Sequence, residues 1–170
     1  MSKLRVRGSL AFDLQPYSDN WAPAVRALHI ASFTVLARGQ HDDEQMAGHA
    51  ALVGAPDYAE DLARSHIVLA LEGDGRLAAT AGWLGGENGI ARIRKVSVRP
   101  DLARRGLASA MLSLAENAAI AAGHTHLALR ASLNAVPLYA KACYTIVSEG
   151  TITTPTGAEL PVVYMERSAA

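Results

Sequence analysis

The sequence has little cysteine, no excess of either charge and no long hydrophobic run. Its single cysteine, Cys143, excludes a disulfide within the chain. Lysine plus arginine number 16, as do aspartate plus glutamate, and this zero net charge disfavours a general nucleic-acid-binding protein. No stretch approaches the roughly 20 apolar residues of a membrane-spanning helix, and the start MSKLRVRGSLAFDL lacks a signal-peptide pattern. We therefore expect a cytoplasmic protein with no membrane or nucleic-acid partner.

Internal repeats, low-complexity blocks and Pro/Gly/Ser-rich linkers are missing as well. The chain has 170 residues, half of them hydrophobic, which suffices for one packed core but not comfortably for two. We therefore expect a single domain over residues 1–170.

Local patterns predict strands and helices in an order typical of a mixed α/β or α+β fold. Two β-rich runs flank Gly73–Gly75, which is a strong hairpin signal. The first helix is expected to turn four residues to one face, namely Val25, Leu28, Ser32 and Val35. The predicted helices cover 20–37, 42–54, 57–64, 106–122 and 135–142, and the predicted strands cover 5–14, 66–71, 76–84, 90–98, 125–130, 144–149 and 160–167.

The most informative stretch is VRPDLARRGLASAML, residues 98–112, where a strand leads through a turn into a helix. The first amides of a helix lack internal partners and the helix dipole is positive there, so a phosphate fits such an end. An ordinary capped helix start is the alternative, and neither a P-loop nor a dinucleotide-binding glycine motif is present. Five residues of this stretch suit an anion site, because each has a small side chain, a hydroxyl group or a positive charge: Arg104, Arg105, Gly106, Ala108 and Ser109.

The same stretch resembles the phosphate-binding segment of the GCN5-related N-acetyltransferases. In that family a strand ending in V-x-P leads to a [Q/R]-x-x-G-x-[G/A] loop and a helix. Gly106 and Ala108 match the last two fixed positions, whereas Ala103 stands where the family has Gln or Arg. ASLNAVPLYAKACY, residues 131–144, resembles the later N/S-x-x-A-x-x-x-Y-x-K-x-G-F segment, with Cys143 in place of glycine, and LPVVYMER resembles the last strand.

This resemblance implies a GNAT-like central mixed, mostly antiparallel sheet flanked by helices on both faces. It implies acetyl-CoA as cosubstrate, no metal, and direct attack by the primary amine of an unidentified acceptor; homodimers are frequent in the family. Backbone amides around residues 104–109 would hold the pyrophosphate, and the strand before them would pair with the pantetheine arm. The implied cofactor-binding residues are Val96, Ser97, Val98, Ala103, Arg104, Arg105, Gly106, Leu107, Ala108, Ser109, Asn134 and Tyr139.

Tyr139 is the predicted general acid, because it matches the tyrosine that commonly protonates the departing CoA thiolate in this family. A phenol has a pKa of about 10, so it keeps its proton at neutral pH and can donate it. The alternative is that Tyr139 is a packing residue on an amphipathic helix. The family's glutamate base falls on Arg92, which cannot accept a proton. Glu87, in the preceding turn, is the nearest acidic candidate, and a water relay is the other.

Three expectations concern residues outside these motifs. Arg92 and Arg94 share one face of their strand, and we expect them to be solvated or to bridge to neighbours rather than to pair with an acidic substrate. Cys143 is expected to be buried near the sheet. The region of the first helix, which includes His29 and Phe33, would line the acceptor pocket by resemblance.

A non-catalytic acyl-CoA-binding module is the alternative function, supported by Ala103 and by the missing acidic base.

Overall fold

The computed structural model describes residues 2–169, and in that range eight strands form one sheet in the order β1-β2-β3-β4-β5-β6-β8-β7. All neighbouring strands are antiparallel except β5 and β6, which are parallel. The strands are β1 (Lys3–Val6), β2 (Leu10–Pro16), β3 (His66–Leu71), β4 (Leu77–Gly85), β5 (Ile90–Val98), β6 (His126–Ser132), β7 (Thr145–Thr153) and β8 (Glu159–Ser168).

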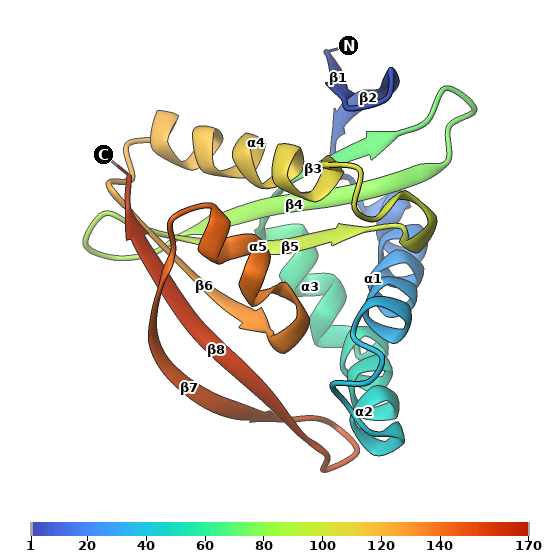
Figure 1. Cartoon of the computed structure of the whole chain (residues 1–170), viewed down its shortest axis with the longest axis vertical. Helices are drawn as coiled ribbons and strands as arrows, with labels where there is room; N and C mark the ends of the chain where they lie inside the picture. Colours follow the sequence, from blue (N-terminus) through green and yellow to red (C-terminus); the bar gives the residue numbers. More distant parts are fainter. Residues whose placement is uncertain (1, 170) are drawn as a thin grey trace.

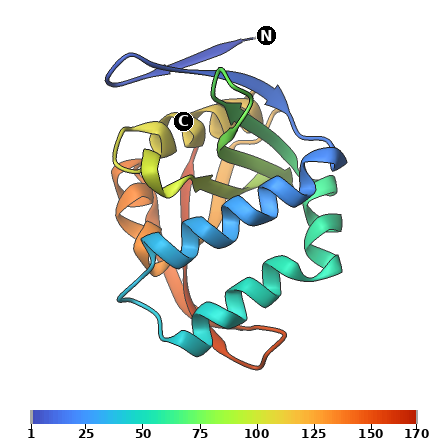
Figure 2. The ribbon, with the colours of Figure 1, turned by 90° about the vertical axis from the view of Figure 1, so that its right-hand side faces the viewer.

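Helices cover both faces of this sheet, so the predicted mixed and mostly antiparallel fold is confirmed. One face carries α4 and α5, which lie in front of the sheet in Figure 1, and the other carries α1, α2 and α3. Figure 2 shows α1 and α2 lying together on that second side. The helices are α1 (Ala22–Leu36), α2 (Asp43–Gly54), α3 (Pro56–Arg64), α4 (Leu107–Ala121) and α5 (Val136–Lys141), with 3-10 turns η1 (Asp19–Trp21), η2 (Pro100–Leu102) and η3 (Leu133–Ala135).

The N-terminal strand predicted over residues 5–14 is in fact a hairpin. Val6 pairs with Leu10, and the chain reverses between them. Gly8 and Ser9 have φ angles of 83° and 63°, which are left-handed values typical of hairpin turns. The Gly-Ser pair was therefore the turn signal, and the sequence prediction passed over it.

The first two helices follow their predicted patterns in different degrees. In α1, Val25, Leu28 and Ser32 are buried as predicted, but Val35 is 47% exposed and His29 is buried instead. The inward face continues through Leu36, which packs against the core, so Val35 lies on the flank of the helix and reaches solvent. No residue of the chain's described part caps α1 through its side chain, whereas α2 begins with a capping box made by Asp42 and Gln45.

The main core lies between the sheet and α4. Leu107, Met111 and Leu112 are nearly fully buried on the inner face of α4. They pack on small side chains of β4 and β5, which let the helix approach the sheet closely: Ala78, Ala79, Ala81 and Ala91. This packing fixes the start of α4 beside the end of β5. No helix within residues 2–169 combines the length and apolar character that crossing a membrane requires.

Two irregularities interrupt the pairing of β5 with its neighbouring strands. The parallel pairing of β5 with β6 runs only from Ile90 to Arg92, although both strands continue. Opposite β4, the register shifts between Thr80 and Gly82, so that two residues of β5 face one residue of β4. Lys95 lies in this bulge with a left-handed φ of 58°. The sheet is therefore open on one edge of β5 and bent on the other.

Candidate functional site

The start of α4 leaves backbone amides without partners inside the helix. Gly106 is the N-cap residue, and no side chain of the described chain caps it. The first amide that donates to a carbonyl at the helix start is that of Ala110, which bonds to Gly106 at 3.1 Å. The amides of Leu107, Ala108 and Ser109 therefore point out of the helix end, where its dipole is positive. This arrangement can hold an anion.

The residues before the helix keep its start open. Gly106 has a φ of 82°, and a side chain at this position would meet no atom within 4 Å. Arg104 also has a left-handed φ, of 62°, and the side chains of Arg104 and Arg105 are exposed. Ala103, where the family has Gln or Arg, is half-buried in extended backbone. The structure thus brings the predicted residues 103–109 together around one open helix end, and this space fits a phosphate group.

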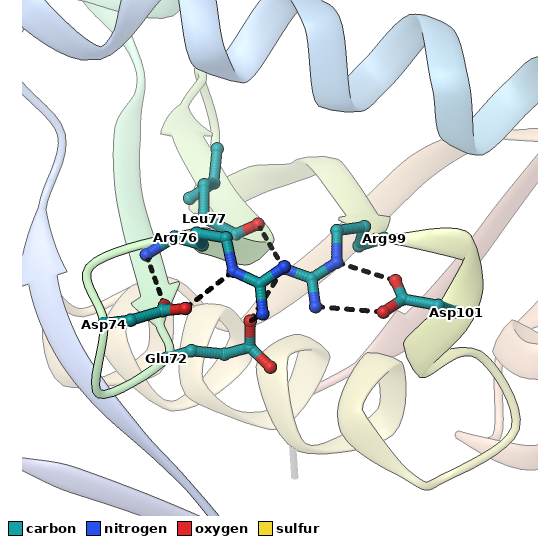
Figure 3. A network of polar contacts seen from close by, with 6 residues as sticks. All are labelled: Glu72, Asp74, Arg76, Leu77, Arg99 and Asp101. Atoms are coloured by element: carbon teal, nitrogen blue, oxygen red, sulfur yellow. Dashed lines mark hydrogen bonds and ion pairs between the residues drawn. The ribbon is translucent and has the colours of Figure 1, made fainter.

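Arg99 holds the loop that leads to α4. Its guanidinium bonds to both carboxylate oxygens of Asp101, at 2.6 and 3.0 Å, and forms an ion pair with Glu72 at 2.9 Å (Figure 3). Its partners Asp101 and Glu72 raise the pKa of Arg99. Arg76 joins the same Glu72 at 3.1 Å. These contacts tie the β3–β4 hairpin to η2, so Arg99 positions the loop rather than the ligand. The sequence prediction missed this role, although Arg99 and Asp101 stand only two residues apart.

One edge of β5 is free next to that loop. Ser97 and Val98 pair with Thr80 and Ala79 of β4 on one side. On the other side, pairing with β6 has already ended at Arg92. The predicted residues 96–98 therefore present backbone groups along an open strand edge, to which an extended ligand can add like a further strand.

Tyr139 lies in α5, which follows β6 and covers the same face of the sheet as α4. The side chain is 7% exposed, and its ring meets that of Tyr144 edge-on, with centroids 5.9 Å apart. Burial, and then the charge of Glu116, raises the pKa of the Tyr139 phenol. The phenol therefore keeps its proton at neutral pH. Asn134, in η3 before this helix, accepts a hydrogen bond from Ser132 at 2.8 Å.

A buried carboxylate beside Tyr139 was not predicted from the sequence. Glu116 of α4 is 6% exposed, accepts a hydrogen bond from the Tyr144 hydroxyl at 2.9 Å, and pairs with Arg167 of β8 at 3.1 Å. Burial of a charge is tolerated when it is paired in this way. The three side chains join α4 and β8 to the turn between α5 and β7, and so support the segment that follows Tyr139.

Glu87 does not join the other candidate residues. It is exposed in the turn before Ile90, whereas the bulge and the open edge of β5 lie toward the opposite end of the strand. Since a strand rises about 3.3 Å per residue, this turn lies roughly 20 Å from Val96. Glu87 therefore lies apart from the other candidate residues, and its role as the base stays a prediction that this position does not favour. Arg92 is exposed, as expected, and Arg94 bridges to Asp61 of α3.

A hydrogen-bond relay connects the bulge of β5 to the helices on the second face. The Lys95 carbonyl can only accept, so the Thr80 hydroxyl donates to it, at 2.6 Å. The Thr80 oxygen then accepts from His29 Nε2, at 2.8 Å, and His29 Nδ1 accepts from the Tyr58 hydroxyl, at 2.6 Å. Burial, and then the charge of Lys95, lowers the pKa of His29 to about 3. His29 is therefore a neutral imidazole that fixes the bulge.

Ionic side chains surround the same bulge. The Lys95 ammonium lies 2.8 Å from a carboxylate oxygen of Asp61 and 3.7 Å from the ring centre of Tyr58. Arg94 pairs with the same carboxylate, and Arg64 lies 3.7 Å from it. Burial lowers the pKa of Lys95 to about 8, against the opposing effect of Asp61. Sequence patterns could not reveal this cluster, because α3 and β5 lie far apart along the chain.

Cys143 is exposed, which corrects the expectation that it is buried. Its φ of 67° is left-handed, and it follows α5 directly, where a helix commonly ends in glycine. This explains why the related motif has glycine at this position. In the part of the chain that the structure covers, no group of three or more His, Cys, Asp or Glu side chains could hold a metal ion.

Comparisons with known proteins agree with this geometry. A structure from Rhodopseudomonas palustris described as a GCN5-related N-acetyltransferase superposes with a TM-score of 0.83 at 24% identity, covering 99% of this chain and 98% of that one. The PaiA N-acetyltransferase from Thermoplasma acidophilum, solved in complex with coenzyme A, gives 0.72 at 13% identity, covering 92% and 98%. The ribosomal-protein-S18-alanine N-acetyltransferase from Escherichia coli gives 0.64 at 16% identity, covering 94% of each chain.

At these identities the structures establish the fold alone, and the family rests on the sequence. Among curated proteins no relative matches. The acetyltransferase (GNAT) family model matches residues 22–143, which is more than half of the chain and includes the loop before α4, the bulge of β5 and Tyr139. The chain therefore belongs to the acetyltransferase (GNAT) family.

Proposed function

We propose that the protein transfers the acetyl group of acetyl-CoA to the primary amine of an acceptor. Acetyl-CoA-dependent acetyl transfer is general to the family. The observation that carries the proposal is the uncapped start of α4, where Gly106 leaves open space beside free backbone amides. A ligand with several phosphate charges suits this positive helix end and the exposed arginines Arg104 and Arg105.

The binding residues divide between two parts of the ligand. The amides of residues 104–109 hold the pyrophosphate, and the open edge of β5 at Val96–Val98 pairs with the extended pantetheine arm. This edge leads from the phosphate loop toward the bulge at Lys95. The thioester is thereby directed to the place where β5 and β6 stop pairing, with Asn134 and Tyr139 beyond the end of β6.

The reaction needs one nucleophile and one proton donor. The nitrogen lone pair of the acceptor attacks the thioester carbonyl carbon, the new C–N bond forms, and the C–S bond breaks. Tyr139 donates its phenolic proton to the departing thiolate, which burial favours because the phenol stays protonated. The amine gives its surplus proton to water, and solvent then restores the proton of Tyr139.

One observation favours a second function, which is acyl-CoA binding without catalysis. Arg92 replaces the family's acidic base, and Glu87 lies at the wrong end of β5. A single assay distinguishes the two functions. It measures the CoA thiol released from acetyl-CoA with and without a panel of primary amines. We expect release to depend on the amine. If acetyl-CoA binds but no amine increases thiol release, the protein is a binding module.

A further inference from the structure

Positive side chains gather on one face of the sheet where β5 and β6 separate. Ile93 and Leu129 are buried in the core under α4. Because side chains alternate along a strand, Arg94 of β5 and Arg130 of β6 point to the other face, which α3 partly covers. Arg94 contacts Asp61 of α3 there. The charge of Arg130 reaches the same region, since it helps to lower the pKa of Lys95.

The charges in this region do not balance. Asp61 is the one carboxylate paired with the cluster among residues 2–169, and it already contacts Arg94, Lys95 and Arg64. Arg130 adds a further positive charge. Cations therefore outnumber the anion that they share, and an anionic ligand is attracted to such a site.

The other titratable groups around the cluster do not correct this excess. His29 of α1 and His49 of α2 are neutral at pH 7, because burial lowers their pKa to about 3 and about 4. Tyr58 of α3 keeps its proton, because burial raises its pKa. Glu166 of β8 contacts His126, at 3.1 Å, at the start of β6 and so four residues away from Arg130. Arg26 of α1 donates to main-chain carbonyls at the end of α2.

Arg94 also has an unused donor. One terminal nitrogen of its guanidinium pairs with Asp61. Its Nε is buried and has no hydrogen-bond partner within residues 2–169. A buried donor without a partner is unfavourable, and because the Arg94 side chain is 25% exposed, a small shift of its guanidinium brings this nitrogen to an acceptor atom of a ligand. A carboxylate offers two such oxygens in the geometry that a guanidinium recognises.

We propose that the amine acceptor carries a carboxylate close to its amino group, and that Arg94 and Arg130 bind this carboxylate. This inference rests on the proposed acetyl transfer and names the class of its acceptor. Arg94 lies next to Lys95 in the bulge, two residues before the strand edge assigned to the pantetheine arm. A carboxylate held there places the neighbouring amine beside the thioester.

The same cations prepare the amine for attack. A positive surrounding disfavours the protonated form of an amine. Burial is the main cause that lowers the pKa of the Lys95 amine to about 8; Asp61 opposes it, and Arg94 and Arg130 add to the lowering. The pKa of an acceptor amine bound nearby is lowered in the same way, so this amine loses its proton to water more readily. This accounts for a site in which Arg92 stands at the position of the acidic base.

The test compares acceptors that differ only in the carboxylate. Thiol release from acetyl-CoA is measured with each L-amino acid, with the matching amino acid carboxamides, and with peptides that begin in aspartate or glutamate. We expect kcat/KM to be at least about 10-fold higher for carboxylates than for carboxamides, as for a charge-assisted hydrogen bond. The peptide arm tells whether the carboxylate belongs to a free amino acid or to an acidic side chain.

Variants assign the preference to the two arginines. Arg94→Gln and Arg130→Gln should each lower kcat/KM for the best carboxylate acceptor by about 10- to 100-fold, with the KM for acetyl-CoA and the rates for carboxamides unchanged. Arg5→Gln is the matched control, because it removes the same charge from an exposed position of β1, at the far edge of the sheet. Arg130 is exposed as well, so its replacement tests the inference without disturbing Asp61.

The outcomes separate this inference from the proposed function. If carboxamides react as well as carboxylates, or if both arginine variants slow the two acceptor classes equally, the protein is an acetyltransferase and the carboxylate site is wrong. If no amine of any class promotes thiol release, the proposed function fails and the acceptor site fails with it. A loss confined to carboxylates in both variants, but not in Arg5→Gln, supports the site.

Discussion

Three individual residues in left-handed backbone conformations lie in the bulge of β5, in the loop before α4 and at the end of α5. Lys95, Arg104 and Cys143 all have left-handed φ angles, between 58° and 67°. A left-handed conformation costs a non-glycine residue roughly 1–2 kcal/mol. At Lys95 the relay from Thr80 holds the strained bulge, whereas at Cys143 an exposed side chain simply ends a helix.

Cys143→Gly is therefore expected to stabilise the protein. Glycine adopts the left-handed conformation without strain but is more flexible in the unfolded chain, so the net gain in the free energy of unfolding should be about 0.5–1 kcal/mol. Urea unfolding measures it. Cys143→Ala is the control, because alanine removes the thiol and keeps the strain. Equal stability of the two variants would show that the backbone conformation is not the cause.

Tyr139→Phe should lower kcat about 10²- to 10⁴-fold, the usual contribution of a general acid, with little change in acetyl-CoA affinity. Tyr144→Phe is its counterpart, since it removes the hydroxyl that donates to buried Glu116. That variant should lose about 1–3 kcal/mol of stability while retaining its kcat. Steady-state kinetics and urea unfolding of both proteins decide the matter. Full turnover by Tyr139→Phe would reassign this phenol to packing.

Among the elements, α4 carries the proposed phosphate site and has a glycine at each end. Gly106 precedes it with a φ of 82°, and Gly123 follows it with a φ of 96°. At neither position would a side chain meet an atom within 4 Å. The two glycines thus serve the same conformational purpose, but only Gly106 lies at the end where the free amides point out.

Gly106→Ala and Gly123→Ala should reduce stability alike, by roughly 1–2 kcal/mol each, because both place alanine in a left-handed conformation. Only Gly106→Ala should weaken CoA binding as well, since it alters the backbone that presents the amides. Calorimetric titration with CoA measures the difference. Equal loss of affinity in both variants would mean that general destabilisation, and not the helix start, explains the effect.

Local sequence signals predicted the elements whose interactions are local. The hairpin at Gly73–Gly75 and the helices predicted over 42–54 and 106–122 depend on neighbouring residues, and all are confirmed. The cluster around Lys95 could not be predicted in this way. His29 and Thr80 stand 51 residues apart, and Arg94 and Asp61 stand 33 apart, so only the packed fold brings them together.

For the molecule as a whole, burial of neutral histidines makes stability depend on pH. His29 and His49 join α1 and α2 to the sheet and to each other, through Thr80 and through a stacked contact with Phe33. Burial lowers their pKa to about 3 and about 4 from the usual 6.5. The unfolded chain therefore binds protons that the folded protein excludes over the range between these values.

Stability should be full above pH 6.5 and should fall as the pH drops toward 4, because acid then favours the unfolded chain. Each histidine should contribute a loss of about 2 kcal/mol between pH 7 and pH 5. His29→Gln should remove about half of this combined loss, whatever its effect on stability at pH 7. Urea unfolding across this pH range gives the slope, and an unchanged slope in the variant would refute the assignment.

The central claim is that this fold binds acetyl-CoA through the start of α4 and the open edge of β5. The most direct test is the unfolding midpoint of the unaltered protein with and without acetyl-CoA. At a concentration 100 times the Kd, binding adds about 2.7 kcal/mol of stability, which for a chain of this length corresponds to a rise of roughly 5–10 °C. No rise with saturating acetyl-CoA or CoA would contradict the account.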